Sequence, residues 1–393
     1  MPASNSDRSK RGNSLKRVLV YMMELCKELS YITDYQKDYK LGMPGCTDQN
    51  QFKAPYLIEF EDHSKWIVYT TTSLRDRIKE YYWDAFNLKN LNTQITAAYL
   101  VYPDSLEQSD RKAFLSKNNK IQSNGEFSTL EAVISQDSFF NRIEAYGIRS
   151  LTQNQQRDKK GNNFEKRVAA ILKNPCNLVK WKTQDDMLEG LHYKIFEDIV
   201  SMFGLDRSSV QNIVSTSDKS IIGFLPSGGP VKTDVLTAVT YTDGTVKHFT
   251  ISCKRSSRSS VSVHQYSADS FTDVLDPANA ELRRVLNEFQ IVGNKRDMNP
   301  EDAQILETEI QPHISALCKW AIGGVGGEGN SDTQWANYIL VYDNNDETIT
   351  MHTTYEYCQR LSQVSTRAFN TPFNWSYQGT RGRSIQLCCP LYL

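Results

Sequence analysis

An aspartate, a serine and a lysine stand at a spacing that could support phosphodiester hydrolysis. Asp234 opens one apolar run, and a second run ends in Ser252-Cys253-Lys254 after an intervening turn. If the two runs are neighbouring strands, about 4.8 Å apart, their side chains can converge on one cation and one phosphate. Asp234 would then ligate Mg²⁺, which needs only one or two protein carboxylates. Lys254 would hold the attacking water, with the Ser252 hydroxyl on the same face of its strand.

The same residues have a simpler explanation, since an aspartate and a lysine on paired strands commonly form an exposed ion pair. Two flanking features favour the nuclease interpretation. Gly228 and Gly229 precede the aspartate and permit a close approach of the backbone to a ligand. The segment after the lysine carries Arg255, Arg258 and several serines without an acid, a composition suited to phosphate contacts. A polar loop is the other interpretation of that segment.

The elements that must position these residues indicate two domains in a chain of 393 residues. The polar run 149–163 has almost no apolar content and is the best candidate for a linker. We therefore predict a disordered arm over 1–14, an N-terminal α+β domain over 15–150 and a second domain over 151–393. Apolar β-rich runs alternate with amphipathic helical segments in both parts, which indicates a mixed α/β fold.

Composition narrows the class of protein. The net charge is −1, so the chain is not a uniformly basic nucleic-acid binder. A local basic patch that contacts phosphates is still compatible with this net charge. No apolar run approaches the roughly 20 residues that span a bilayer, and the polar N-terminus lacks a secretion signal, so we expect a cytoplasmic protein. The eight cysteines form no CxxC pair, which predicts reduced thiols rather than a zinc site.

Several ordered motifs from about residue 160 onward resemble one family. These are "GNNFEKRV", "GGPVKTDV", "ISCKRSSRSSVSVHQY" and "FNWSYQGTRGRSIQL". Together they resemble the MspI family of type II restriction endonucleases, which carries a variant PD-(D/E)xK nuclease site. The resemblance implies a mixed β-sheet core flanked by helices. It also implies Mg²⁺-dependent cleavage of double-stranded DNA at CCGG, leaving 5′-phosphates.

The same resemblance sets expectations for partners. A bacterial restriction-modification system would supply a cognate DNA methyltransferase, with which no stable complex is expected. A palindromic site suits a homodimer, although a monomer could nick each strand in turn. Two rival functions stay open at this point: a non-catalytic DNA-binding protein on a nuclease fold, and a nuclease that requires modified cytosine.

The catalytic positions follow from the matched motifs. Asp234 matches the family's metal-binding aspartate and Lys254 its catalytic lysine, while Ser252 stands where the family has an asparagine. Glu165 in "GNNFEKRV" matches a glutamate on the first helix of the nuclease core and would approach the metal directly or through water. The alternative for Glu165 is a surface ion pair with a neighbour one helical turn away.

The residues expected to contact DNA lie in two segments. Ser262 falls at the family's spacing for a base-contacting serine, and Gln265 would lie one turn further if that segment were helical. In the C-terminal segment, Ser376 and Gln386 match positions that reach bases in the major groove. Contacts to phosphate or guanine are expected from Arg255, Arg258, Arg381 and Arg383. The family's lysine two residues after the glutamine is replaced here by Cys388, which removes a cation from this surface.

The resemblance does not cover the N-terminal domain. Its hairpin-then-helix order is similar to a nuclease core without its lysine, since Thr70 to Thr72 stand at the strand end. A cluster of cations among aromatic residues could contact DNA, and a solvated helix with an aromatic core stripe is the alternative. The cluster consists of Arg75, Arg77, Lys79 and Lys89 around Tyr81, Tyr82 and Trp83.

Overall fold

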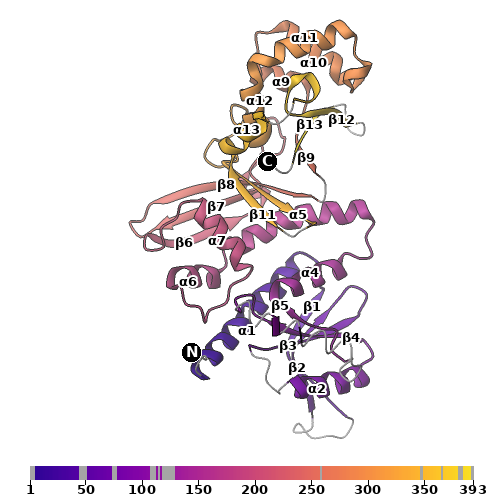
Figure 1. Ribbon diagram of the computed structural model, residues 1–393, viewed down its shortest axis with the longest axis vertical. Helices are drawn as coiled ribbons and strands as arrows, with labels where there is room; N and C mark the ends of the chain where they lie inside the picture. Colours follow the sequence, from indigo (N-terminus) through magenta and orange to yellow (C-terminus); the bar gives the residue numbers. More distant parts are fainter. Residues whose placement is uncertain are drawn as a thin grey trace. The chain divides into compact units, whose positions relative to one another are not determined.

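The computed structural model describes residues 5–43, 51–72, 78–106, 112–113, 116, 129–256, 259–345, 348–363, 366–378 and 384–390. The chain divides into two compact units. The first contains residues 1–159 and 174–197, and the second contains 160–173 and 198–393 (Figure 1). Each unit is built around its own five-stranded sheet.

The first unit contains a mixed sheet in the order β1-β2-β3-β4-β5. The first three strands form an antiparallel meander, and β4 and β5 then run parallel to β3. The strands are β1 Asp34–Gly42, β2 Gln51–Glu59, β3 Lys65–Thr70, β4 Ile95–Tyr102 and β5 Ala132–Ser135. The helices are α1 Asn5–Glu28, α2 Ile78–Leu91, α4 Gln136–Gly147 and α6 Pro175–Thr183.

The second unit contains a five-stranded sheet in the order β11-β10-β8-β7-β6 and a three-stranded sheet in the order β12-β13-β9. Its strands are β6 Val210–Thr216, β7 Val235–Tyr241, β8 Val246–Ser256, β9 Ser260–Tyr266, β10 Tyr338–Asp343, β11 Ile349–Thr353, β12 Asn374–Gln378 and β13 Ser384–Pro390. Its helices are α8 Lys219–Ile222, α9 Ala268–Leu275, α10 Ala280–Val292, α11 Pro300–Ile310, α12 Ile314–Gly323 and α13 Thr354–Gln363. Two helices, α5 Gln153–Leu172 and α7 Tyr193–Met202, contain residues of both units.

The two five-stranded sheets repeat one connection pattern. In each, three antiparallel strands are followed by a helical crossover to a strand parallel to the third. The crossover is α2 between β3 and β4 in the first unit, and it includes helices α9 to α12 between β8 and β10 in the second. The repeat ends at the fifth strand, because β5 is parallel to β4 whereas β11 is antiparallel to β10.

Each sheet of the second unit has a face that packs on a buried apolar core. On β7 and β8, Val235, Val239, Phe249 and Ile251 are buried, with the period-2 spacing of a strand that covers a core. The three-stranded sheet packs one face on helices α9 to α12 (Figure 1). Aromatic side chains such as Phe271 belong to the buried cluster between them. The opposite face of that sheet is polar.

Two segments expected to lack regular structure are helical. The segment 5–14, expected as a disordered arm, forms the first turns of α1, and contacts with 185–189 anchor it. The Ser14 hydroxyl accepts a hydrogen bond from the Glu189 amide at 2.8 Å, and Arg11 donates to the Asp186 carbonyl at 2.9 Å. Most of the polar run 149–163 is the start of α5. Its glutamines, arginines and lysines favour helix even without apolar residues, so low hydrophobicity alone was a poor signal of a linker.

Within the described ranges, no helix is long and apolar enough to cross a membrane. The seven cysteines that the structure describes are free thiols, and most of them are buried. No group of three or more His, Cys, Asp or Glu side chains suited to holding a metal occurs among the described residues.

Candidate functional site

Asp234 lies directly before β7, and its carboxylate is turned toward β8. Its backbone amide donates to the Ile251 carbonyl at 2.9 Å, which extends the β7–β8 ladder by one residue. One carboxylate oxygen, Oδ2, accepts hydrogen bonds from the Cys253 amide at 2.8 Å and from the Ser252 hydroxyl at 3.2 Å. The orientation of this carboxylate is therefore fixed by β8, and Ser252 is one of the groups that fix it.

Lys254 lies on the same face of β8 as Ser252 and reaches the same carboxylate. Its Nζ is 3.5 Å from Asp234 Oδ2. Burial acts to lower the pKa of Lys254, but the negative groups around it, Asp234 first and Glu165 among them, together outweigh burial and the pKa is raised. Lys254 is therefore a cation at neutral pH, next to the aspartate as the spacing of the two runs predicted.

Glu165 and a second lysine complete the cluster. Glu165 lies on α5, and Lys219 is the first residue of the short helix α8, whose N-cap is Asp218. Lys219 Nζ is 3.7 Å from Glu165 Oε2 and 3.4 Å from Asp234 Oδ1. The two carboxylates thus converge on one ammonium group. Lys219 was missed in the sequence because a lone lysine 15 residues before the aspartate has no motif spacing.

The environment of Glu165 changes its protonation. Burial, and next the negative charge of Asp234, raise the pKa of Glu165 to about 7, although Lys219 and Lys254 act in the opposite direction. A carboxyl with such a pKa is poised between its two forms at neutral pH. A cation that binds between the carboxylates would favour the ionised form.

The donor set fits a hard divalent cation. Two carboxylates from α5 and from the start of β7 face the same point, where the Lys219 ammonium already provides positive charge. Mg²⁺ is held in proteins by one or two carboxylates and keeps several of its waters. The described residues offer no cluster of three metal-ligating side chains here, so the set is a poor match for a closed zinc site.

The residues expected to read bases come together on the three-stranded sheet. The Ser376 hydroxyl donates to Gln386 Oε1 at 3.3 Å, and Gln386 Nε2 donates to the Ser262 hydroxyl at 2.9 Å. Gln265 lies directly opposite Gln386 in the register and donates to the Ser384 hydroxyl at 2.8 Å. Hydroxyl and amide groups from three strands therefore share one polar face.

The segment that carries Ser262 and Gln265 is strand β9, not a helix. β-branched Val261 and Val263 alternate with polar residues there, which is the period of a strand. Cys388, at the position where the resemblance led us to expect a lysine, pairs with Ser262 across β13 and β9. Burial raises the pKa of the Cys388 thiol, so this position carries no charge at neutral pH.

Of the arginines expected to contact DNA, the structure describes Arg255. Arg255 donates to Asn344 Oδ1 at 2.7 Å, and its guanidinium lies 4.9 Å from the centre of the Tyr342 ring. The other arginines proposed to contact DNA, Arg258, Arg381 and Arg383, lie outside the described residues, as do Arg75 and Arg77.

The aromatic helix of the first unit is partly exposed. Trp83 on α2 is 63% exposed and stacks on Phe86, whereas Tyr82 is buried. Lys89 on the same helix pairs with Glu131 at 3.1 Å. The helix therefore combines a buried aromatic stripe with an exposed aromatic pair.

Known proteins give the family of this chain. Residues 143–389 match the family described as restriction endonuclease MspI. The type II restriction enzyme BsuFI of Bacillus subtilis is 24% identical over 403 aligned residues, which cover 98% of each chain. The type II restriction enzyme MspI of Moraxella sp is 21% identical over 61% of this chain and 94% of its own length.

A solved structure of restriction endonuclease MspI in complex with its cognate DNA has the same fold. It superposes with a TM-score of 0.52 at 18% identity, covering 64% of this chain and 98% of that one. This confirms the predicted mixed α/β fold with a PD-(D/E)xK core. Because the family match covers more than half of the chain, the chain belongs to the restriction endonuclease MspI family and is a DNA-cleaving enzyme of the type II restriction class.

Proposed function

We propose that this chain hydrolyses double-stranded DNA at CCGG with Mg²⁺, leaving 5′-phosphate and 3′-hydroxyl ends. The observation that carries the proposal is the convergence of Glu165, Asp234, Lys219 and Lys254 within one partly buried cluster. Two acids facing one point, with a lysine beside them, are what metal-assisted phosphodiester hydrolysis requires. This site would serve a restriction-modification system with a separate cognate methyltransferase.

Each residue has a distinct part in the proposed reaction. Asp234 and Glu165 would hold Mg²⁺, which when bound supplies charge stabilisation to the phosphate and the leaving oxygen. Lys254 would hold the attacking water in line with the leaving oxygen through a charge-assisted hydrogen bond. Ser252 keeps the Asp234 carboxylate turned toward the site by its hydrogen bond of 3.2 Å.

The polar face of the three-stranded sheet is the proposed base-reading surface. Ser262, Gln265, Ser376 and Gln386 offer both donors and acceptors from neighbouring strands. Amide and hydroxyl side chains of this kind distinguish base pairs by their edges in the major groove. The cations Arg255, Arg258, Arg381 and Arg383 would contribute phosphate contacts, which position the protein without reading sequence.

The test is digestion of unmethylated phage DNA, with and without Mg²⁺, followed by sequencing of the ends. Wild type is run beside Lys254→Ala and beside Lys247→Met, which replaces an exposed lysine on the same strand. We expect discrete fragments with ends at CCGG from wild type and Lys247→Met, and none from Lys254→Ala. Fragments at another sequence would retain the chemistry and overturn the specificity.

The two rival functions are distinguished by adding a binding assay and a methylated substrate to this experiment. A non-catalytic DNA-binding protein would retain site-specific binding in all three proteins and cut in none. A nuclease that requires modified cytosine would cut a methylated substrate and spare the unmethylated one. Sedimentation of the complex with a duplex of one site would decide whether a monomer or a homodimer binds.

A further inference from the structure

Lys232 links the segment that carries Asp234 to strand β9. It stands two residues before the aspartate, yet its side chain points toward the other sheet. Its Nζ donates to the Val263 carbonyl at 2.6 Å and lies 3.0 Å from His264 Nδ1. One side chain thus joins the segment before β7 to the strand that carries Ser262 and Gln265.

The segment between Lys232 and Asp234 is tightly held. Thr233 is fully buried, its amide donates to the Gln334 carbonyl at 3.2 Å, and its carbonyl accepts from Lys219 Nζ at 3.3 Å. The Asp234 amide is in turn bound to Ile251. A displacement of the Lys232 end is therefore transmitted to the Asp234 carboxylate, because the short segment between them has little freedom to absorb it.

The β9 end of the link is equally well fixed. His264 is 2% exposed and packs among aromatic rings, with its centroid 3.9 Å from that of Trp320 and 4.4 Å from that of Tyr266. Val263 and His264 are both buried and lie between Ser262 and Gln265, which are exposed, because the register of β9 against β13 shifts at this point. Lys232 thus binds the inner face of the strand whose outer face is the proposed base-reading surface.

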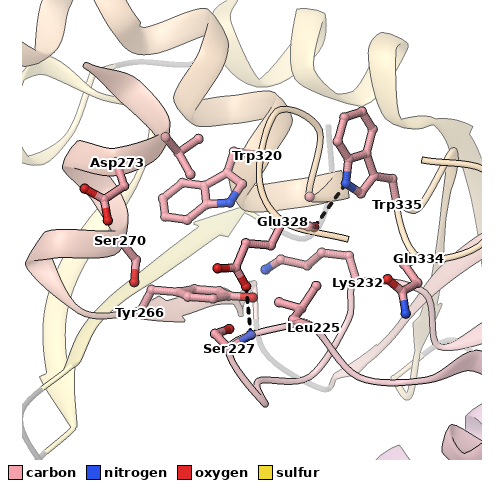
Figure 2. Close-up of a pocket in the computed structure, with 12 residues that line it drawn as sticks. Leu225, Ser227, Lys232, Tyr266, Ser270, Asp273, Trp320, Glu328, Gln334 and Trp335 are labelled. Carbon is pink, nitrogen blue, oxygen red and sulfur yellow. Dashed lines mark hydrogen bonds between the residues drawn. The ribbon is translucent and has the colours of Figure 1, made fainter. Parts of the chain in front are cut away.

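The stem of Lys232 has little room to move elsewhere. Gly324 packs against it with φ of +79°, and a Cβ added at that glycine would lie 3.0 Å from Lys232 Cγ. Figure 2 shows the lysine extending between the loop that carries Glu328 and the ring of Tyr266, which is 5.6 Å from Nζ. The glycine loop 323–329 thus borders the pocket that Lys232 enters, together with Trp320.

We propose that Lys232 is a positioning residue that couples base reading on β9 to the placement of Asp234. The inference rests on the proposed function. A correct base pair holds β9 at the position that seats Lys232 Nζ on the Val263 carbonyl and on His264, and Asp234 then sits where cleavage needs it. A wrong base pair shifts β9, and the link carries that shift to the carboxylate. Lys232 acts through Asp234 and does not itself read a base.

The test compares Lys232→Met with wild type and Lys247→Met. Methionine keeps the length of the stem and its packing but removes the amino group that contacts Val263 and His264. Single-turnover cleavage is measured on a duplex with the site that wild type cuts, and on duplexes with one base pair changed. Affinity is measured separately without Mg²⁺, at several salt concentrations. We expect the cognate rate to fall about 10- to 100-fold, the scale on which a small misplacement of a reacting group slows catalysis.

The discriminating readout is the ratio of cognate to altered-site rates. We expect this ratio of rates to fall in Lys232→Met, while the affinity for DNA and its salt dependence stay at the wild-type level. An unchanged ratio would overturn the proposal. A uniform loss of affinity with a weaker salt dependence would also overturn it, since that result identifies Lys232 as a phosphate contact. Absence of cleavage by wild type itself would refute the proposed function instead.

A second variant covers the case in which Lys232→Met does not fold. His264→Phe retains the aromatic packing and removes only the Nδ1 partner, so one of the two contacts of the ammonium remains. We expect a smaller fall in the ratio of cognate to altered-site rates, with a melting temperature within a few degrees of wild type. A full wild-type ratio in this variant, with Lys232→Met unfolded, would count against the coupling.

Discussion

Lys219 and Lys254 contact opposite oxygens of one carboxylate, that of Asp234. Lys219 Nζ lies 3.4 Å from Oδ1, and Lys254 Nζ lies 3.5 Å from Oδ2. Lys219 also forms an ion pair with Glu165, at 3.7 Å, so it occupies the point at which the two carboxylates converge. The two lysines therefore have separable effects, one on the proposed cation site and one on the water beside it.

Replacing Lys219 by methionine is expected to change the response to Mg²⁺ rather than the fold. Without the ammonium, Glu165 and Asp234 repel each other in the metal-free protein, so its melting temperature falls. Bound Mg²⁺ then restores more stability than in wild type, because it no longer competes with a lysine. Thermal unfolding with and without MgCl₂ measures this, with Lys247→Met as the control. An equal gain from Mg²⁺ in the variant and wild type would contradict the competition.

The raised pKa of Glu165 predicts a pH-dependent stability. In the folded protein the pKa is about 7, above the ordinary 4.5, so the folded state binds the proton more tightly. The stability that protonated Glu165 contributes is therefore lost as pH rises from 4.5 through about 7. We expect Glu165→Gln to be more stable than wild type at pH 8 without metal, and about equally stable at pH 5.

Urea unfolding at the two pH values, in EDTA, checks this difference. The same variant should lose cleavage at both pH values, because an amide is a weaker ligand for Mg²⁺ than a carboxylate. Glu288→Gln, on α10 in the second unit, serves as the control, since Glu288 lies outside the cluster of Glu165, Asp234, Lys219 and Lys254. A stability difference between Glu165→Gln and wild type that is the same at pH 5 and pH 8 would show that the ionisation of Glu165 is not its cause.

Gln386 occupies the centre of the polar face and should determine specificity at one base pair. Its amide group contacts both Ser376 and Ser262, so alanine removes the link between three strands. A base contact of this type contributes about 1–3 kcal/mol of discrimination. Gln386→Ala is therefore expected to slow cognate cleavage about 5- to 150-fold and to relax selectivity at one position. Rates on duplexes altered at each position measure this, with exposed Gln359→Ala as the control.

Cys388 stands where the resemblance led us to expect a lysine, and Cys388→Lys should add a cation there. The new lysine would lie opposite Ser262 on the base-reading surface. We expect tighter binding of DNA at low salt and a steeper dependence of affinity on salt, by about one unit of slope if the lysine reaches a phosphate. Cys388→Met provides the uncharged control of similar length. Identical salt slopes for the two variants would place position 388 away from the DNA.

The sequence predicted the parts of the site that lie close together on paired strands. The Asp234, Ser252 and Lys254 arrangement follows from two apolar runs and a turn, because strand pairing converts that spacing into contact. Lys219 and Lys232 could not be predicted, since their positions depend on a four-residue helix and on the packing of a second sheet. Local patterns contain no information about either.

Helix and strand assignments failed where composition was ambiguous. The polar start of α5 was expected to be a linker, yet helix propensity and the buried Phe164 further along organise it. The serine-rich segment around Ser262 was considered as a possible helix, but pairing with β13 makes it a strand. For β9, a partner distant in the sequence decided the local conformation.

The repeated connection pattern of the two units has a consequence for the order in which the two strands of a duplex are cut. β3 and β8 occupy the same place in the two patterns. β8 carries Lys254, whereas the end of β3 carries Thr70, and a hydroxyl cannot supply the charge of an ammonium. Of the two described sheets, the second therefore carries the acid–lysine set. When a single copy acts, the phosphodiester bonds of a site are broken one after the other. A supercoiled plasmid is then converted first to a nicked open circle and next to the linear form. The lifetime of the open circle measures the interval between cleavage of the first strand and cleavage of the second.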